Sequence, residues 1–385
     1  MQSIAQPWLV LQLTHSGFLV GLVLAVQNLP ILVAGPFGGL VADRYPKRRI
    51  LQVTQAAFMV PALFLFAVTM TGRVQYWMVM LSALAWGAIQ VVDVPTRQAF
   101  SIEMVGRDDL MNAIALNSAA WNGAAVVGPT VAGLLIAVIG VPLCFLVNGL
   151  SYIAVIVALT LMRNLPSLVS DPDRQPLFQR MREGARYLQR DPLVGGMLFV
   201  VAVFSLFAMN RLTLIPLFAD GVLKAGAAGF GFLMAALGLG ALTGGLSLAL
   251  IPHSASGRRQ FWIGLLWAAS LFAFSFSRSM PTSLALLFAA GVCQMWFLAI
   301  ANTRIQMATP DRLRGRVMAF YAQAMMGVGP LGATQAGVLA SIFGAPSAMW
   351  AGAAACGLMI FAVRIIHREV FTLEPDDYRD TDRKF

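Results

Sequence analysis

The stretch GGLVADRYPKRR, residues 38–49, joins two long apolar segments of this chain. Its first three residues recur as Gly244-Gly245-Leu246. Two further pairs repeat at nearly the same interval: Thr96-Arg97 with Thr303-Arg304, and Gly128-Pro129 with Gly329-Pro330. All three matches are 201 to 207 residues apart, which indicates two related halves laid head to tail.

The composition indicates a membrane protein. Hydrophobic residues make up 58% of the 385 residues and charged residues only 11%, too few to cover a soluble protein of this size. The apolar segments are also long enough to cross a bilayer, which takes about 20 helical residues. They predict an all-α membrane protein with two six-helix bundles and twelve spans, at 1–13, 17–42, 50–71, 74–98, 112–138, 141–162, 193–219, 226–251, 260–277, 281–307, 317–342 and 345–366.

The predicted organisation has four parts. An N-terminal bundle over 1–163 is joined to a C-terminal bundle over 193–367 by a cytoplasmic linker over 164–192, and a disordered cytoplasmic tail follows over 368–385. The first span, 1–13, is too short to cross, so we expect a truncated first helix. The linker carries basic and bulky apolar residues, which fits either an amphipathic helix on the inner leaflet or a solvated linker helix.

The basic residues predict an orientation. Loops rich in Lys and Arg stay in the cytoplasm, and here the segments 44–49, 163–190 and 312–316 all fall on one side. Both termini are therefore expected in the cytoplasm, with the protein in a bacterial plasma or inner membrane. The net charge of +10 follows this topology and contact with the lipid bilayer, so no nucleic-acid partner is expected.

The stretch at 38–49 resembles the signature loop of the major facilitator superfamily. The resemblance implies a secondary transporter that alternates access to a midplane site by rocking its two halves. In such a loop the glycines let helices approach closely, while the charged pair engages a neighbouring helix end in one conformation. A plain basic turn would explain the basic residues but not the order of the motif. The gating residues implied are Gly38, Gly39, Asp43, Arg44 and Arg48.

Three further segments resemble particular branches of this superfamily. Residues 93–100, DVPTRQAF, and 312–318, RLRGRVM, are similar to the branch that contains enterobactin-exporter-like and macrolide-type efflux proteins, which implies export. Glycine and proline in the fifth span are similar to the Gly-Pro motif of antiporters, although ordinary helix packing also explains them. These residues are Gly123, Gly128, Pro129 and Gly133.

Asp93 is the acid that the span boundaries place inside the membrane. Arg97 follows four residues later, so both side chains share one helix face and can pair. Two interpretations remain open. Desolvation and the nearby cation could tune Asp93 to load and release a proton, or the two residues could form a static ion pair that holds the helix end.

Polar and aromatic residues of the expected cavity helices are candidates for binding substrate. Arg211 lies within the seventh span, where an unpaired cation is costly. It is expected either to face the central cavity, where it would bind an anionic cargo group or pair with an acid, or to reach the cytoplasmic interface. The resemblance implies Gln90, Asn210 and Gln294 as further hydrogen-bonding candidates and Trp86 and Trp296 as apolar walls, each of which could instead serve helix packing.

The sequence shows no pattern typical of an enzyme. Its three cysteines, Cys144, Cys293 and Cys356, are isolated in apolar segments, so neither a metal site, a cofactor nor a nucleophile-base pair is expected. We expect a monomeric secondary transporter that exports small amphipathic molecules, either siderophores or drug-like compounds, with protons as the coupling ion. An importer of the same fold, or a truncated non-transporting membrane protein or receptor, remains an alternative.

Overall fold

The computed structural model describes residues 2–105, 110–162, 177–250 and 256–372, and within these ranges it contains helices and no strand. The first half holds α1 (Gln2–Thr14), α2 (Gly17–Arg44), α3 (Lys47–Met70), α4 (Tyr76–Val105) and α5 (Leu110–Leu161). The linker contributes α6 (Leu177–Arg190). The second half holds α7 (Pro192–Phe207), α8 (Arg211–Gly221), α9 (Gly226–Leu250), α10 (Gly257–Phe276), α11 (Met280–Ala308), α12 (Asp311–Ala322), the π-helix η1 (Gln323–Gly327), α13 (Gly329–Phe343), α14 (Ala345–Ile366) and α15 (Glu369–Thr372).

A glycine with positive φ separates the last two spans of each half. Gly140 has a φ of 82° and divides α5 into two helices, which correspond to the predicted spans 112–138 and 141–162. Gly344 has a φ of 85° and separates α13 from α14. Glycine adopts this conformation without the strain that a side chain would add. The two glycines lie 204 residues apart, in agreement with the internal repeat.

Among the described residues, nine segments are long and apolar enough to cross a membrane. They coincide with nine of the twelve predicted spans. Of the other three, 1–13 corresponds to the short helix α1, 260–277 to α10, and 112–138 to the first part of α5. The chain is a multi-pass membrane protein.

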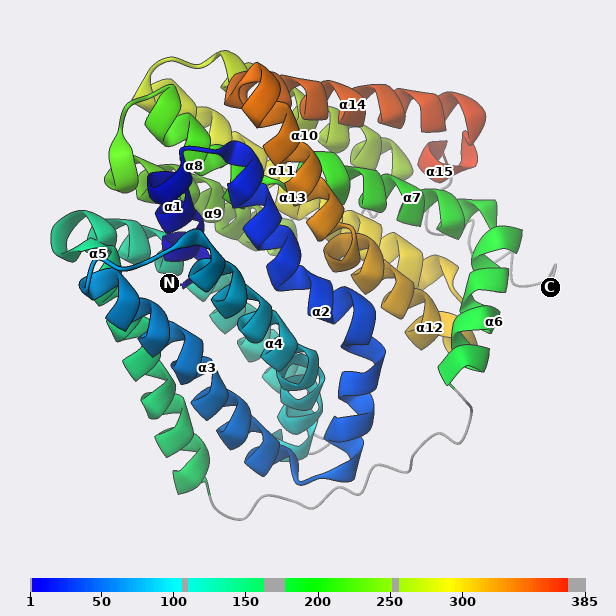
Figure 1. Cartoon of the computed structure of the whole chain (residues 1–385). Coiled ribbons are helices and arrows are strands. Elements are labelled where there is room, and N and C mark those ends of the chain that lie inside the picture. Colours follow the sequence, from blue (N-terminus) through cyan, green and yellow to red (C-terminus); the bar gives the residue numbers. More distant parts are fainter. Residues whose placement is uncertain (1, 106–109, 163–176, 251–255, 373–385) are drawn as a thin grey trace.

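The two halves lie side by side (Figure 1). Across their interface α2 packs along α13 and α5 along α9. Within the halves, α2 packs on α4 and α9 on α11 through equivalent backbone contacts. A Cβ atom at Gly87 would lie 1.9 Å from the carbonyl oxygen of Gln27, and one at Gly291 would lie 2.1 Å from that of Leu237. The same close packing in both halves fits two related bundles.

The helices run between two ends of the molecule. At the end that we call the basic end, α2 ends at Arg44, α3 begins at Lys47 and α14 ends near Arg364. At the opposite end α1 finishes at Thr14 and α2 begins at Gly17. From the opposite end, α2 and α13 run side by side, and α2 then separates from α12 toward the basic end (Figure 1).

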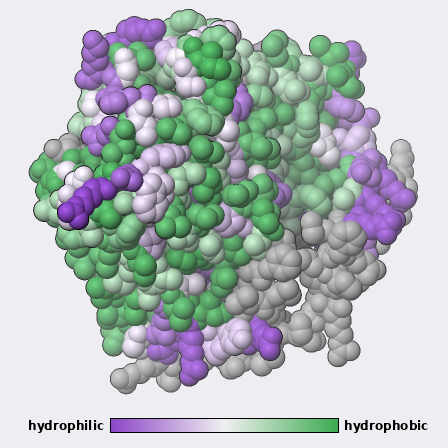
Figure 2. Space-filling view, in the orientation of Figure 1, coloured by the Kyte–Doolittle hydropathy of each residue, from purple (hydrophilic) through white to green (hydrophobic). Residues whose placement is uncertain are grey.

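Large apolar side chains cover the flanks of the molecule. Val60, Leu246 and Leu358 are 67%, 62% and 72% exposed. Figure 2 shows that hydrophobic residues occupy most of the middle of this face, with hydrophilic residues toward its edges. Exposing such apolar side chains to water is unfavourable, so hydrocarbon covers this surface better, and the helices satisfy their own backbone groups there.

The chain after α14 is structured further than its composition predicts. Residues 369–372, expected at the start of the disordered tail, form α15 instead. Val370 and Phe371 are buried, and the ring of Phe371 lies 5.6 Å from that of Phe261. Two apolar side chains therefore fix a segment whose charged neighbours suggest disorder. Residues 373–385 lie outside the described part of the chain.

Candidate functional site

The seventh predicted span is interrupted part of the way across. α7 ends at Phe207 and α8 begins at Arg211. At the break, Nδ2 of Asn210 donates a hydrogen bond to the carbonyl oxygen of Leu206 at 2.7 Å, which satisfies a group at the end of α7. α13 passes close to this point, because a Cβ atom at Gly332 would lie only 2.6 Å from the same carbonyl oxygen. Asn210 thus stabilises the interruption as well as facing the cavity beside it.

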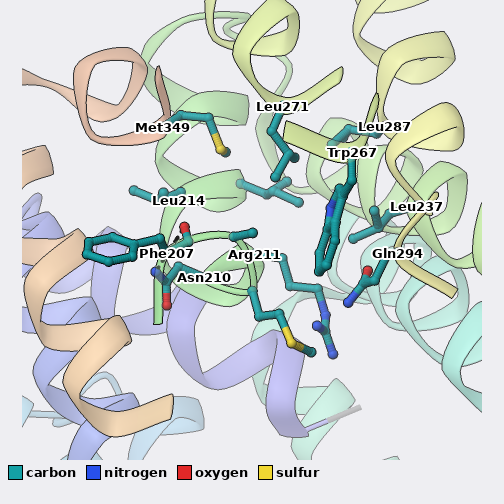
Figure 3. Close-up of a pocket in the computed structure, with 13 residues that line it drawn as sticks. Phe207, Asn210, Arg211, Leu214, Leu237, Trp267, Leu271, Leu287, Gln294 and Met349 are labelled. Atoms are coloured by element: carbon teal, nitrogen blue, oxygen red, sulfur yellow. Dashed lines mark hydrogen bonds between the residues drawn. The ribbon is translucent and has the colours of Figure 1, made fainter. Parts of the chain in front are cut away.

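A cavity lies next to the break (Figure 3). Its empty space, counted with the part open to solvent, is about 380 Å³. Three of its polar side chains are Asn210, Arg211 and Gln294, all predicted from the sequence as substrate-binding candidates. The ends of Arg211 and Gln294 lie toward the same region, beside Trp267 (Figure 3). Apolar walls are contributed by Leu214, Leu237, Trp267, Leu271, Leu287 and Met349.

Arg211 is the charged group of this cavity. No described residue forms a hydrogen bond or ion pair with its side chain. It also stands at the start of α8, where the first backbone N–H groups have no side-chain cap. The positive end of a helix and a guanidinium at one point favour a negatively charged group there. The cavity therefore combines apolar walls with a site of positive potential.

The other three substrate candidates do not line this cavity. Trp86 packs with Phe58, at 5.8 Å between ring centres, inside the first half. Trp296 donates from Nε1 to the carbonyl oxygen of Gly244 at 2.7 Å and so joins α11 to α9. Gln90 is half-buried on α4. For the two tryptophans these contacts match the packing alternative rather than a wall of the cavity.

Asp93 is almost fully buried, at 2% exposure, and its carboxylate accepts four hydrogen bonds. Oδ1 accepts from Oγ1 of Thr54 at 2.7 Å and from Nε2 of Gln55 at 2.9 Å. Oδ2 accepts from Nη2 and Nε of Arg97 at 2.8 and 3.2 Å. The cluster joins α3 to α4 near the basic end. Thr54 and Gln55 were not predicted, because a hydroxyl and an amide in an apolar span give no charge signal.

The second half has a counterpart of this cluster. Nη1 of Arg304 donates to Oε1 of Gln260 at 2.6 Å, between α11 and α10. Gln260 lies 206 residues after Thr54, and Arg304 lies 207 residues after Arg97. Arg304 is fully buried, at 0% exposure. Although the Thr-Arg repeat was visible in the sequence, its role in joining two helices was not, because the amide of Gln260 in an apolar span gives no charge signal.

The signature stretch is described only in part. Gly38, Gly39 and Asp43 fall in α2, but their side-chain surroundings lie outside what the structure describes. Arg44 is exposed, with its guanidinium carbon 6.0 Å from the ring centre of Tyr45. Nη2 of Arg48 donates to the carbonyl oxygen of Thr160 at 2.6 Å, near the end of α5. Their gating roles stay predictions.

The proposed Gly-Pro motif is also described in part. Among the side chains that the structure describes, nothing lies within 4 Å of a Cβ atom built at Gly128. Gly123, Pro129 and Gly133 lie in α5, with side-chain surroundings outside the described part. The packing role of the motif stays a prediction.

Comparison with known proteins agrees with the helical arrangement. A family of the major facilitator superfamily, described as transmembrane secretion effector, matches residues 1–383. The enterobactin exporter EntS of Shigella boydii serotype 4 (strain Sb227) is 27% identical over 372 residues, which cover 94% of this chain and 86% of that protein. EntS of Escherichia coli O157:H7 (strain EC4115 / EHEC) is similar to the same extent.

Solved structures show the same fold at low identity. The nucleoside transporter NupG superposes with a TM-score of 0.76 at 10% identity, over 94% of this chain and 93% of that one. An inward-facing, unoccupied bacterial homologue of the lysosomal transporter Spinster gives 0.72 at 16%, over 96% and 91%. A D-xylose-proton symporter gives 0.72 at 14%, over 97% and 94%. This chain is a membrane transporter, not an enzyme, and belongs to the transmembrane secretion effector family of the major facilitator superfamily.

Proposed function

We propose that this protein exports small, anionic, siderophore-like molecules from the cytoplasm by alternating access. The observation that carries the proposal is Arg211, a cation without a described partner in an apolar cavity inside a membrane protein. An unpaired charge at that depth is costly, and an anionic ligand would offset the cost. The exporters named among the relatives support the direction of transport.

The contacts between the two halves support a rocking mechanism. At the opposite end α2 and α13 touch through their backbones, since a Cβ atom at Gly21 would lie 2.3 Å from the carbonyl oxygen of Ala333. Nearby, the rings of Trp8 and Phe230 stack across the interface at 6.0 Å. If the basic end is cytoplasmic, as the charge rule predicts, these contacts must open to release cargo outside.

We also propose that a proton gradient drives export. For Asp93 the four hydrogen-bond donors favour the static alternative, in which it joins α3 to α4, over a role as the proton carrier. In either case, collapse of the pH gradient should stop transport. An Asp93→Asn protein that retains gradient-driven transport would exclude the carrier role.

The proposal is tested with inside-out vesicles, into which an exporter moves its cargo. The probes are a catecholate siderophore with free acidic groups and its neutral methylated analogue. Arg211→Gln should reduce uptake of the acidic probe about tenfold or more, since hydrogen bonds to charged groups contribute about 1.5–3 kcal/mol. Arg211→Lys should retain part of the activity. Arg259→Gln, the same change at an exposed position, is the matched control.

The outcomes separate charge recognition from general damage. Loss confined to the acidic probe would support the proposal. Equal loss of both probes in Arg211→Gln would remove the argument for an anionic cargo. Transport of the acidic probe only into right-side-out vesicles would contradict export.

A further inference from the structure

The eleventh predicted span, at 317–342, is not one continuous α-helix. α12 ends at Ala322, the next five residues form the π-helix η1, and α13 begins at Gly329. Pro330 follows at once and cannot donate a backbone hydrogen bond. A π-turn widens a helix and is a frequent site of bending. The span therefore consists of two α-helical arms, α12 and α13, joined by a π-turn at which a helix can bend.

The arm toward the opposite end, α13, is fixed to the first half. A Cβ atom at Gly337 would lie 2.6 Å from the carbonyl oxygen of Gly17, and one at Gly21 would lie 2.3 Å from that of Ala333. Contacts of this kind leave no space between α13 and α2. In the present conformation α13 is therefore packed backbone to backbone against α2.

The arm toward the basic end, α12, is attached to the linker helix α6 instead. Nη1 of Arg316 donates to Oε2 of Glu183 and forms an ion pair with it. One residue further along α6, a Cβ atom at Gly184 would lie 2.9 Å from Cε2 of Phe320. The hydroxyl of Tyr187 lies 3.2 Å from the carbonyl oxygen of Ala308, which precedes α12. α6 thus contacts α12 at Glu183 and Gly184, and the end of α11 at Tyr187, on one helix face.

A side chain from the second half holds the joint between the arms. Oγ of Ser205, buried on α7, donates to the carbonyl oxygen of Met325 within η1 at 2.6 Å. Gln323 folds against the same turn, because a Cβ atom at Gly327 would lie 2.3 Å from its Nε2. The carbonyl group of Met325 therefore accepts a hydrogen bond from a side chain outside its own helix.

We infer that α6 steers α12 about a hinge at η1, with the Glu183–Arg316 pair as the contact that transmits the motion. α12 then moves with α6, while α13 stays on α2 until the opposite end opens. The inference goes beyond the proposed function and does not depend on the identity of the cargo.

The test measures the position of α12 by distances between spin labels. One pair joins Ala319→Cys on α12 to Val94→Cys on α4, and a control pair joins Leu331→Cys on α13 to Val33→Cys on α2; all four positions are exposed. The three native cysteines are replaced by alanine. Each pair is measured in the otherwise unchanged protein and in the variants below, after size-exclusion chromatography has confirmed that the variant is folded.

Charge exchange gives the decisive comparison. Glu183→Arg and Arg316→Glu should each shift or broaden the α12–α4 distances, leave the α13–α2 distances unchanged and lower the transport rate about fivefold or more. The double exchange should restore both readouts. Single exchanges that leave the α12–α4 distances as they were would overturn the inference, as would a folded double exchange that restores neither readout.

Two milder variants test the same inference if the charge-reversal variants do not fold. Glu183→Gln removes the ion pair without repulsion and should broaden the α12–α4 distances. Ser205→Ala frees the hinge and should do the same with the ion pair intact. Unchanged distances in both variants would overturn the inference. Because these readouts need no cargo, a failure of the proposed anionic specificity would leave them unaffected.

Discussion

Gly21→Ala is the substitution that bears most directly on how the opposite end is closed. Gly21 lies on α2, in the interface with α13, and the oxygen of Ala333 stands where a side chain would begin. Adding one methyl group therefore places a wedge between the two halves while changing nothing else in the cavity. We expect the variant to favour the conformation in which this end is open.

The size of the effect follows from the contact distance. The new Cβ atom would lie 2.3 Å from the carbonyl oxygen. A relaxed carbon-oxygen contact is about 3.3–3.6 Å, so the backbones must separate by about 1 Å. Overpacking of this kind costs about 1–3 kcal/mol. Since about 1.4 kcal/mol is a tenfold change, the ratio of closed to open molecules should fall about 5- to 150-fold.

The assay measures the distance between spin labels at Arg73→Cys and Ser341→Cys, two exposed positions at the opposite end of the first and second halves. Gly21→Ala should add or enlarge a population with a longer distance. The matched control is Gly357→Ala, where the nearest atom to the new Cβ lies 4.0 Å away and no shift is expected. If Gly21→Ala leaves the distances as in the control, the backbone contact does not hold this end closed.

Substitutions at three further positions test the packing within the two halves. Asp93→Asn removes the charge that Arg97 pairs with and should lower the melting temperature in detergent without abolishing gradient-driven transport. Loss of the gradient dependence with an unchanged melting temperature would contradict the static role of Asp93. Gln260→Leu removes the amide that binds the buried Arg304 and should destabilise the protein by about 1.5–3 kcal/mol, whereas Gln260→Glu should be tolerated better. A thermal shift assay that ranks the two variants the other way would refute the role of Gln260 in joining α10 to α11. Phe371→Ala empties a fully buried site and should destabilise the second half by about 3–5 kcal/mol, measured by thermal unfolding. A loss of stability as small as that from replacing an exposed phenylalanine by alanine would refute the role of α15 in packing.

Much of the fold could be predicted because hydrocarbon imposes long apolar helices and duplication imposes a repeat. The 204-residue spacing of Gly140 and Gly344 follows the register of the signature repeat. Arg211 could be singled out because a cation is costly in such a span, and Gln294 because the family resemblance places its helix at the cavity. The predicted spans match the helices, apart from the interruptions in the seventh and eleventh spans, because hydrocarbon requires long apolar segments.

The interruption before Arg211 could not be predicted, because residues 192–221 still qualify as one membrane span by length and composition. The break depends on a tertiary contact, the close approach of Gly332 to the end of α7. Trp296 was expected in the cavity, yet its indole is hydrogen-bonded to α9, which sequence spacing does not reveal. Burial of Phe371 likewise depends on a tertiary contact, with the ring of Phe261 on α10. Contacts between elements decided each of these features.

The central claim is that the two halves separate at the opposite end during each transport cycle. It is tested most directly by linking Trp8→Cys to Phe230→Cys with a short, reducible crosslinker, across the pair of rings that stack at 6.0 Å. The account predicts that the crosslinked protein does not transport and that reduction restores the rate of the unlinked double variant. Transport at the full rate with the crosslink intact would contradict it.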